Sequence, residues 1–564
     1  MGRADLILIH APSVYDFRQR AIMYGPISDL IPSSPVFEMY PLGFMTIASY
    51  LEQRGYRVRI INLALRMMED RKFDVPAFLA RLKPQLFGID LHWLPHAHGS
   101  LEVARILKKI HPEIPIVLGG LSSSYYHREL IGYPQVDYVV RGDATEEPLY
   151  QLLKRIEGHE PVDDLPNLVW KENGEVKVNE MGFMPESLDY VDLRPDLLIR
   201  QVLRYRDRRS LMPYSGWWGN PVTALITVKG CTHSCATCGG SREAFLRTTG
   251  RGRPAYRSPE SMLKNILDIA GFSRGPIFII GDIRQPGERY AQELLKLLRQ
   301  NPVKNELVFE LFSVAEREFI EEIDNSVQSW TLELSPESHD PEIRKIHDPT
   351  VSYANEEIED TISYALSTKC HRVDVFFMIG LSHQTYGSVR GTADYVEGLF
   401  KRFDRRLSAF ISPMGPFLDP GSRGFEDPQG LGYRLFAHTL EEHRQLLLQP
   451  TWKYMLNYET EWMSRDELVR ATYDAGERFN RLKLEYGRIA RRQGAAVAAR
   501  IAHARELQKR LDGYDLQEKL PPEELVGEVR KFSVSTVCDK RELAWPTHLV
   551  NFKPLGIARA LLGH

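Results

Sequence analysis

The chain has 564 residues, long enough for about three or four domains, and its 43% hydrophobic and 26% charged residues are typical of a globular protein. This composition excludes a mainly disordered chain. The formal net charge of −3 excludes a global field that would recruit nucleic acid or an anionic membrane. Five cysteines in so long a chain exclude a disulfide scaffold.

The sequence contains no recognisable membrane or secretion signal. No segment reaches the roughly 18 uninterrupted apolar residues of a membrane helix. The apolar run that ends before His10 and Pro12 is shorter than a signal-peptide core, which needs about 7–15 residues. We therefore expect a cytoplasmic protein with reduced thiols, in which clustered cysteines indicate metal or redox chemistry, and no membrane or nucleic-acid partner.

Residues 1–156 alternate short apolar runs with amphipathic segments. The runs predict five strands, at 4–12, 58–64, 86–93, 114–120 and 136–143. Helical periodicity between them covers 41–56, 74–84 and 100–112, and a last helix runs from Glu146 or Glu147 to Ile156. This alternation predicts a doubly wound parallel sheet of the Rossmann-like kind. Ligands of such sheets bind beyond the carboxyl ends of the strands.

The rest of the chain divides into three segments. Residues 157–220 hold a predicted hairpin around Asn173 and Gly174, followed by a proline- and charge-rich stretch that we interpret as linker and cover. Residues 221–420 predict a partial (β/α)6 barrel with chemistry at the carboxyl ends of its strands, which are expected at 222–230, 277–282, 306–312, 329–335, 373–380 and 407–414.

Residues 421–564 lose the alternation and predict a helical C-terminal domain. Its basic stretch 481–510 is better explained by a solvated helix face than by a nucleic-acid surface. Four aromatic residues among charges either line a substrate groove or pack the helices onto the barrel, and we favour packing. They are Trp452, Tyr454, Tyr458 and Trp462.

The strongest motif is a CxxxCxxC loop formed by Cys231, Cys235 and Cys238, directly after the first strand of the second series. Three thiolates on one loop can hold three irons of a 4Fe–4S cluster and leave the fourth iron open, because no other cysteine is near. Structural zinc normally has four ligands with paired CxxC spacing, and His233 lies inside the same tight loop, so we favour the cluster. Cys370 and Cys538 receive no such role.

The loop and the strands after it, over about 222–415, resemble the radical SAM superfamily. In that family the open iron binds S-adenosylmethionine (SAM), and an external one-electron donor drives its cleavage to a 5′-deoxyadenosyl radical. The resemblance implies SAM-binding residues at three further strand ends, although single apolar residues there are equally explained as barrel core. These candidates are Gly281 and Asp282, where the family has Gly-Gly-Glu, then Glu333, Ser335 and Glu337, and finally Met378, Ile379 and Gly380.

Residues 1–156 resemble the cobalamin-binding domain that precedes many radical SAM cores, with a generic nucleotide-type fold as the alternative. Gly119 and Gly120 let the backbone approach a bulky planar ligand. The turn from Arg141 to Glu146 takes the place of the family's acidic Gly-Glu-Gly-Glu turn. The candidate cobalamin-binding residues are Asp90, His92, Gly119, Gly120, Ser122, Gly142 and Glu146.

The resemblance departs from cobalamin mutases in one loop. Mutases place a cobalt-ligating histidine after the first strand, whereas Pro12 to Arg20 contain no histidine here. We expect no histidine ligand from this loop, and a dimethylbenzimidazole tail that is detached from cobalt and buried in the domain. The later group Asp90, His92, His96 and His98 is expected to form pocket wall rather than to ligate cobalt.

Together these features resemble a cobalamin-dependent (class B) radical SAM methyltransferase. The resemblance implies methylation of an unactivated carbon through methylcobalamin and a 5′-deoxyadenosyl radical. The C-terminal segment looks like an archaeal branch that includes the glutamine C-methyltransferase of methyl-coenzyme M reductase, so we expect a protein or peptide substrate and a post-translational modification.

Other functions stay open beside this expectation. Within the enzyme class they are a methylase of a small-molecule natural product or lipid, and a cobalamin enzyme that works without a free radical or without methylation. A tRNA-modifying radical SAM enzyme is disfavoured because the N-terminal region has no cysteine and the C-terminus is helical. A non-catalytic cobalamin sensor is disfavoured because all three cluster cysteines are present.

Overall fold

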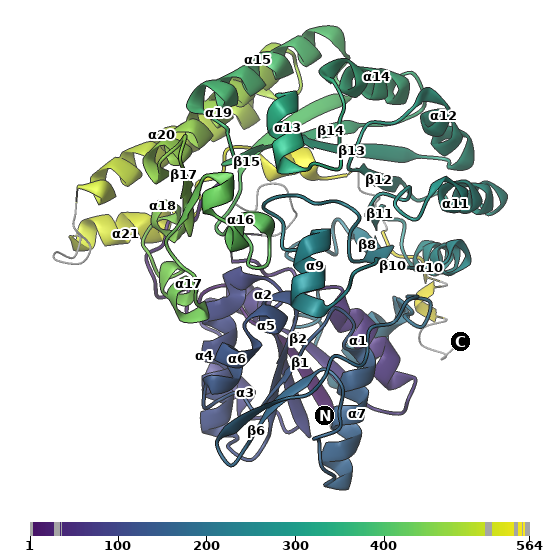
Figure 1. Cartoon of the computed structure of the whole chain (residues 1–564), viewed down its shortest axis with the longest axis vertical. Helices are drawn as coiled ribbons and strands as arrows, with labels where there is room; N and C mark the ends of the chain where they lie inside the picture. Colours follow the sequence, from purple (N-terminus) through teal and green to yellow (C-terminus); the bar gives the residue numbers. More distant parts are fainter. Residues whose placement is uncertain are drawn as a thin grey trace.

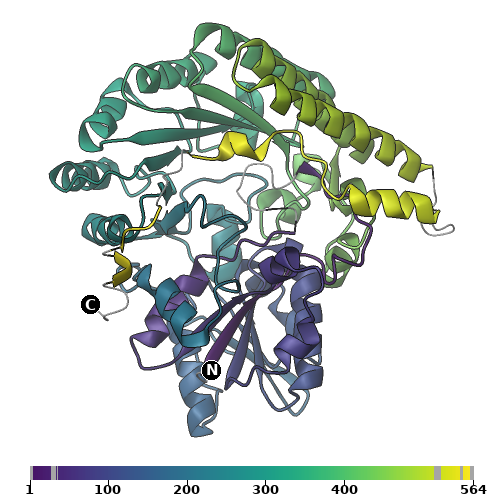
Figure 2. The ribbon, with the colours of Figure 1, turned by 180° about the vertical axis from the view of Figure 1, so that it is seen from behind.

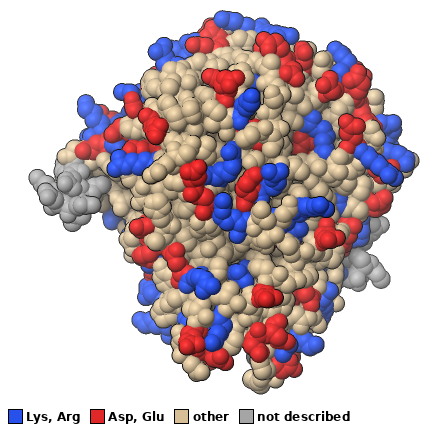
Figure 3. Space-filling model, in the orientation of Figure 1, with Lys and Arg blue, Asp and Glu red and all other residues tan. Residues whose placement is uncertain are grey.

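The computed structural model describes residues 4–26, 34, 36–513, 522–545, 551–554 and 556–558. Two α/β units lie one above the other, the N-terminal unit in purple to blue and the second in teal to green (Figure 1). The C-terminal helices run along one side of the second unit. Positive and negative side chains are interspersed over the face in Figure 3, as expected for a small net charge.

The first sheet confirms the predicted parallel, doubly wound fold. Its strand order is β2-β1-β3-β4-β5-β6-β7, and the first five strands are parallel. Strands β1 to β3 are entirely buried, which explains their continuous apolar sequences. These five strands are β1 (Leu6–His10), β2 (Val58–Asn62), β3 (Leu86–Asp90), β4 (Ile116–Gly119) and β5 (Tyr138–Val140).

Helices cover both faces of this sheet (Figure 1). Helix α4 carries an apolar stripe that includes Leu101, Val103 and Ala104, all fully buried against the strands. The helices of this unit are α1 (Gly43–Glu52), α2 (Leu63–Glu69), α3 (Val75–Leu79), α4 (Ala97–Ile110), α5 (Leu121–Tyr125), α6 (His127–Gly132) and α7 (Glu146–Gly158).

The predicted hairpin around Asn173 and Gly174 is present, as β6 (Leu168–Glu172) and β7 (Glu175–Val178). It does more than the linker role that the sequence suggested, because β6 pairs antiparallel with β5 and the hairpin extends the first sheet. Helix α8 (Asp196–Tyr205) follows and packs on α1.

The second sheet confirms the partial barrel. Its order is β15-β14-β13-β12-β11-β8, with every neighbouring pair parallel, so the sheet is open at β8 and β15. The strands are β8 (Thr223–Ile226), β11 (Ile277–Ile280), β12 (Leu307–Leu311), β13 (Trp330–Glu337), β14 (Val373–Ile379) and β15 (Leu407–Pro413). All six fall within the predicted ranges or extend them by no more than two residues.

Helices cover the outer face of this second sheet (Figure 1). They are α10 (Pro259–Phe272), α11 (Glu288–Gln300), α12 (Arg317–Ser326), α14 (Asn355–Leu366) and α15 (Tyr386–Arg402). The loops at the carboxyl ends carry the smaller elements β9 (Val228–Lys229), α9 (Arg242–Thr249), β10 (Ala255–Tyr256) and α13 (Pro341–His347).

The C-terminal region is mainly helical, as predicted, and packs onto the barrel. Helix α19 (Arg465–Glu485) contacts α15, β15 and the antiparallel α20 (Arg491–Asp512), and Figure 2 shows the two long helices side by side. The smaller elements are α16 (Arg423–Glu426), β16 (Tyr433–Leu435), α17 (Leu440–Leu446), α18 (Trp452–Met455), β17 (Tyr458–Thr460) and α21 (Glu523–Lys531).

The packing role favoured for the aromatic residues of this region is confirmed for two of them. Trp452 and Tyr458 are fully buried; Trp452 donates a hydrogen bond to the Tyr473 hydroxyl (2.9 Å) and Tyr458 donates one to the Met414 carbonyl (2.7 Å). Within the described residues, no helix has the length and apolar composition needed to span a bilayer.

A segment near the C-terminus lies against the inner side of the second sheet (Figure 2). Cys538 and Leu543 pack there on Phe376 of β14 and Phe410 of β15. This contact covers the part of the inner face that a closed barrel would bury against further strands.

Candidate active site between the two sheets

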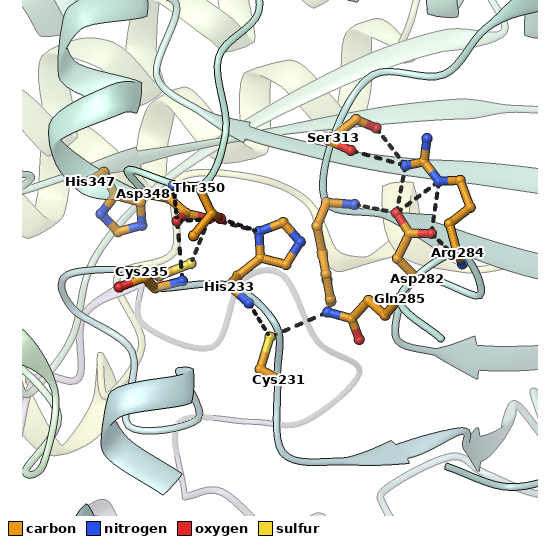
Figure 4. Close-up of polar contacts among 12 residues, drawn as sticks. Cys231, His233, Cys235, Asp282, Arg284, Gln285, Ser313, His347, Asp348 and Thr350 are labelled. Carbon is orange, nitrogen blue, oxygen red and sulfur yellow. Dashed lines mark hydrogen bonds and ion pairs between the residues drawn. The ribbon is translucent and has the colours of Figure 1, made fainter. Parts of the chain in front are cut away.

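The three cysteines of the motif lie on the loop that follows β9. The backbone N–H groups of His233 and Gly240 donate to the sulfurs of Cys231 (3.4 Å) and Cys238 (3.2 Å), and the Gln285 side-chain amide also donates to Cys231 (3.3 Å; Figure 4). Three thiols on one loop, with N–H donors aimed at sulfur, form a donor set that fits a 4Fe–4S cluster. Within the described chain, no group of three or more His, Cys, Asp or Glu side chains is arranged to hold a single metal ion.

Two carboxylates that the sequence analysis missed hold this loop in place. Asp348 pairs with His233 (Nδ1 to Oδ2, 2.7 Å; Figure 4) and accepts the N–H of Ser234 (3.1 Å). Asp419 accepts the N–H of Gly239 (3.0 Å). Burial opposes ionisation of Asp348, but hydrogen bonds from His233 and Thr350 outweigh it and hold its pKa well below the usual value. Asp348 is 115 residues from His233 in the chain, so no local spacing marks it.

The surroundings of the cysteine loop oppose ionisation of the free thiols. Burial raises the pKa of Cys231 and, more strongly, of Cys235 above the ordinary thiol value. Both thiols are therefore protonated at neutral pH when no metal is bound. Cluster ligation then requires the release of these protons, which iron, as a Lewis acid, drives.

Asp282, predicted to receive the SAM amino group, is already engaged with protein. Its carboxylate forms a bidentate pair with Arg284 (Nε to Oδ1, 2.9 Å) and accepts the backbone N–H of Phe312 (3.3 Å). The same guanidinium donates to the Ser313 carbonyl (3.0 Å; Figure 4), so the pair ties the end of β11 to the end of β12.

Glu310 of β12 is the carboxylate that the sequence analysis missed beside Asp282. Its side chain accepts the backbone N–H of Gly281 (2.9 Å), a residue whose φ of 94° favours glycine. Side chains of a strand point alternately to its two faces. The helix-covered face of β12 carries Leu307, Phe309 and Leu311, so Glu310 faces the inner side of the sheet.

Glu310 gathers with two further glutamates on this inner side, next to Asp374 of β14, which pairs with Arg372 (2.8 Å). Glu333 of β13 pairs with Glu310 in register, and Glu337 lies at the end of the same strand, with Ser335 between them. Within the described structure, Glu333 and Glu337 form no hydrogen bond or ion pair. Burial and then the neighbouring carboxylates raise the pKa of Glu310 to about 7, of Glu337 to about 8, and of Glu333 well above its ordinary value.

This acidic group fits a cationic ligand, because a positive charge would restore the ionised form of each carboxyl group. SAM carries an ammonium and a sulfonium, so the residues present suit it. Of the other predicted SAM residues, Ile379 is fully buried in the sheet core. Gly380 lies at the end of β14, where a Cβ would come within 2.4 Å of the Tyr458 hydroxyl oxygen. Contact of these two residues with adenine stays a prediction.

We expect Glu310→Gln to weaken SAM binding to the cluster-loaded, unreduced protein by about 10-fold or more, because a charge-assisted hydrogen bond is lost. Since only the ionised form pairs with a cation, wild-type affinity should rise from about pH 6 to about pH 8, and this rise should be smaller in the variant. Equilibrium dialysis would measure both. The exposed Glu321→Gln on α12 is the control; equal affinities for all three proteins would contradict the assignment.

A cavity of about 530 Å³ separates the two sheets. Six of the seven predicted cobalamin-binding residues line it, namely Asp90, His92, Gly119, Gly120, Gly142 and Glu146. Ser122 is not among the residues that line the cavity; its hydroxyl donates to the carbonyl of His92, which does line it (3.2 Å). The cavity also reaches Leu8, Gly88 and Val117, in the middle of β1, β3 and β4, which fits a detached nucleotide tail inserted into the domain.

The histidines around β3 have separate roles. His10 pairs with Asp90 (Nδ1 to Oδ1, 3.0 Å) and bonds the Phe37 carbonyl through Nε2 (2.8 Å). His96 bonds the Ala11 carbonyl (3.0 Å), and His98 accepts the Tyr15 N–H (3.2 Å). Of the predicted group, His92 is the histidine that lines the cavity without a ring hydrogen bond to any described residue. Burial lowers its pKa, which keeps its ring neutral.

We expect the EPR spectrum of the cob(II)alamin-loaded protein to lack nitrogen superhyperfine splitting, because loop 12–20 has no histidine and both ring nitrogens of His10 are engaged. Splitting that disappears in His92→Ala but persists in His127→Ala, whose ring bonds the Ser124 carbonyl away from the cavity, would contradict this expectation and assign His92 as a cobalt ligand.

The acidic turn after β5 also joins the two units on either side of the cysteine loop. Glu146 pairs with Lys229 (3.3 Å), which precedes the loop, and accepts the hydroxyl of Thr46 (2.8 Å). Asp143 forms a bidentate pair with Arg251, which follows the loop, and both side chains are at most 5% exposed. The turn therefore sets the position of the cavity relative to the cysteines.

Comparison with known proteins agrees with this geometry. Residues 30–149 match the B12 binding domain, and residues 225–396 match the radical SAM superfamily. The chain is 23% identical over 287 residues to hopanoid C-3 methylase of Methylococcus capsulatus, covering 50% of each protein. It is 24% identical over 299 residues to the anaerobic magnesium-protoporphyrin IX monomethyl ester cyclase of Synechocystis sp., covering 52% of each. The chain thus spans about half the length of these curated relatives.

Two solved structures share the fold. The radical SAM methyltransferase TsrM from Kitasatospora setae, with tryptophan and a SAM analogue bound, superposes with a TM-score of 0.55 at 16% identity, covering 77% of this chain and 79% of its own. The cobalamin-dependent SAM radical enzyme OxsB superposes with a TM-score of 0.53 at 14% identity, covering 95% of this chain and 76% of its own. The predicted cofactors, namely cobalamin, SAM and a 4Fe–4S cluster, are confirmed at the level of the domains. The chain therefore joins a B12 binding domain to a radical SAM domain and a helical C-terminal region, in the fold of cobalamin-dependent radical SAM enzymes.

Proposed function

We propose that the protein is a cobalamin-dependent radical SAM methyltransferase that methylates an unactivated carbon. One observation carries the proposal: Lys229, two residues before Cys231, lines the same cavity as six of the predicted cobalamin-binding residues. Cobalamin in the cavity and SAM at the cysteine loop would therefore face one shared space. When bound, these cofactors supply the radical and the methyl group, and the protein supplies position and exclusion of water.

The chain's own residues divide this work. The acidic group of Glu310, Glu333 and Glu337 would hold the cationic end of SAM. The ion pairs Glu146–Lys229 and Asp143–Arg251 would hold the cavity and the cysteine loop in fixed positions relative to each other. The mainly apolar cavity wall keeps water away from reactive species. The role of a general base is assigned to no residue.

The reaction class is tested with protein loaded with cobalamin and cluster, SAM and a strong one-electron reductant. We expect 5′-deoxyadenosine and, with substrate present, S-adenosylhomocysteine, both measured by chromatography with mass detection. Cys235→Ala is the control that should form no 5′-deoxyadenosine. A fully loaded wild-type protein that leaves SAM intact would support the sensor alternative instead.

The finer prediction of a glutamine in methyl-coenzyme M reductase is tested with a peptide that contains this glutamine. The expected product is heavier by the mass of one CH₂ group. An unchanged peptide, in a preparation that cleaves SAM, would reject this substrate without rejecting the reaction class.

The alternative substrate class is a small-molecule natural product or a lipid. The mainly apolar lining of the cavity favours this class, because a small apolar molecule gains free energy from burial there, whereas a polar glutamine side chain does not. The proposed reaction also needs an external one-electron donor, which would drive the cleavage of SAM.

A further inference from the structure

The sulfurs of the cysteine loop receive hydrogen bonds from two kinds of donor. The backbone N–H groups of His233 and Gly240 lie two residues after the cysteines they contact, so the loop supplies these donors itself. Gln285 is different, because it belongs to the turn after β11 and lies 54 residues from Cys231 in the chain. Among the described residues, Gln285 is the one whose side chain donates to a sulfur of this loop (3.3 Å; Figure 4).

The other end of the Gln285 amide has no partner. Its carbonyl oxygen Oε1 is buried and accepts no hydrogen bond from any described residue. A buried polar atom without a partner typically costs more free energy than one hydrogen bond contributes. The opposite orientation of the amide would set its carbonyl oxygen against the electron-rich sulfur of Cys231. The amide therefore adds little to the stability of the fold, which favours a role at the sulfur instead.

The turn that carries Gln285 is fixed by the ion pair of Asp282 with Arg284. The Asp282 carboxylate accepts the backbone N–H of Arg284 (2.9 Å), and the Asp282 carbonyl accepts that of Gln285 (3.0 Å). The Arg284 guanidinium donates in turn to the carbonyl of Val314, after β12 (2.7 Å). The backbone of Gln285 is thus anchored to the ends of two strands, and its amide reaches Cys231 from a fixed base.

A hydrogen bond to a ligating sulfur changes the energy of electron transfer. An iron–sulfur cluster that accepts an electron gains negative charge, part of which lies on its sulfur ligands. An N–H donor at such a sulfur stabilises the reduced form more than the oxidised form, and so raises the reduction potential. Burial strengthens this effect, because water screens the amide dipole less there.

We propose that Gln285 raises the reduction potential of the 4Fe–4S cluster through its N–H···S hydrogen bond to Cys231. Gln285 is a positioning residue that acts through this ligand, and it eases the one-electron reduction that must precede SAM cleavage. The inference rests on the cluster that the proposed function requires, and it is independent of the methyl transfer and of the substrate.

The test is an EPR-monitored redox titration of the full chain, loaded with cluster and cobalamin and free of SAM. Gln285→Met keeps the length of the side chain and removes the amide. We expect this variant to lower the equilibrium constant for reduction by about 10-fold, which is a shift of about 59 mV to lower potential for one electron. Gln292→Met is the control, because Gln292 is exposed on α11; its potential should equal that of the wild type.

A second measurement needs wild-type protein alone, and it decides the matter if Gln285→Met does not fold or does not load with iron. With ¹⁵N in the side-chain amides of glutamine, the reduced cluster should show a ¹⁵N coupling in its pulsed EPR spectrum, transmitted through the hydrogen bond. Equal potentials for wild type and Gln285→Met would overturn the proposal, as would a wild-type spectrum without this coupling. Neither measurement requires turnover, so failure of the methyltransferase proposal is seen separately, in the product assay.

Discussion

Replacing Cys231, Cys235 or Cys238 by alanine is expected to abolish the cluster. Each variant should lose most of its iron and sulfide after anaerobic reconstitution, together with the visible absorption of the cluster, because each thiolate holds one iron and no fourth cysteine is near. Cobalamin content should stay close to the wild-type value, since the cobalamin cavity is lined by other residues. Iron counts and the UV–visible spectrum measure both cofactors at once.

The remaining two cysteines provide controls within the same chain. Cys370 is buried in the core of the barrel, with its thiol directed at the Arg372 carbonyl (3.1 Å), and Cys538 packs on Phe376 and Phe410. Cys370→Ala and Cys538→Ala should therefore retain full iron content. Loss of iron in either control variant would show that the cysteines are wrongly divided between ligands and core.

The second large effect is expected at the buried pair Asp143–Arg251. Asp143→Ala leaves a guanidinium that is 4% exposed without its carboxylate, which should lower the free energy of unfolding by about 3–5 kcal/mol. Arg251 follows the cysteine loop and Asp143 lines the cavity, so we also expect weaker cobalamin binding. Denaturant unfolding followed by fluorescence, and titration with cobalamin, measure the two effects.

Two further variants test whether the lost stability comes from leaving a buried charge without its partner. The double variant Asp143→Leu with Arg251→Met should recover most of the lost stability, because a buried ion pair and an apolar pair of similar size differ little in free energy. Asp164→Ala removes one of two carboxylate partners of Arg155, in a pair whose carboxylate is 64% exposed, and should cost no more than about 1 kcal/mol. Similar losses for Asp143→Ala and Asp164→Ala would contradict the role given to the buried pair.

The candidate site was predictable where its signal is local. The cysteine loop is identified by spacing alone, because three cysteines lie within eight residues. Gly119 and Gly120 were predicted because glycine at the end of a buried strand allows close backbone approach, and Gly142 from the resemblance of its turn to the family's acidic turn; all three line the cavity. These positions need no knowledge of how distant segments pack.

The rest of the site depends on residues that are distant in the chain. Asp348 and Asp419 hold the cysteine loop, yet each is an ordinary acidic residue in its own sequence context. Asp282 takes the place of the family's acidic residue and pairs with Arg284 two residues later, while Glu310 on the next strand accepts the N–H of Gly281 from the inner side of the sheet. No periodicity distinguishes a carboxylate that faces inward from one that its neighbour neutralises.

The sequence by itself determined the two parallel sheets, the helical C-terminal region and the cysteine loop, because strand and helix periodicity and ligand spacing are properties of contiguous residues. The tertiary structure decided which carboxylates lie on the inner side of the second sheet, how the acidic turn after β5 pairs with residues on either side of the cysteine loop, and which residues line the cavity between the two units. These features arise from contacts between segments far apart in the chain, whose energies depend on burial and distance that the order of residues does not reveal.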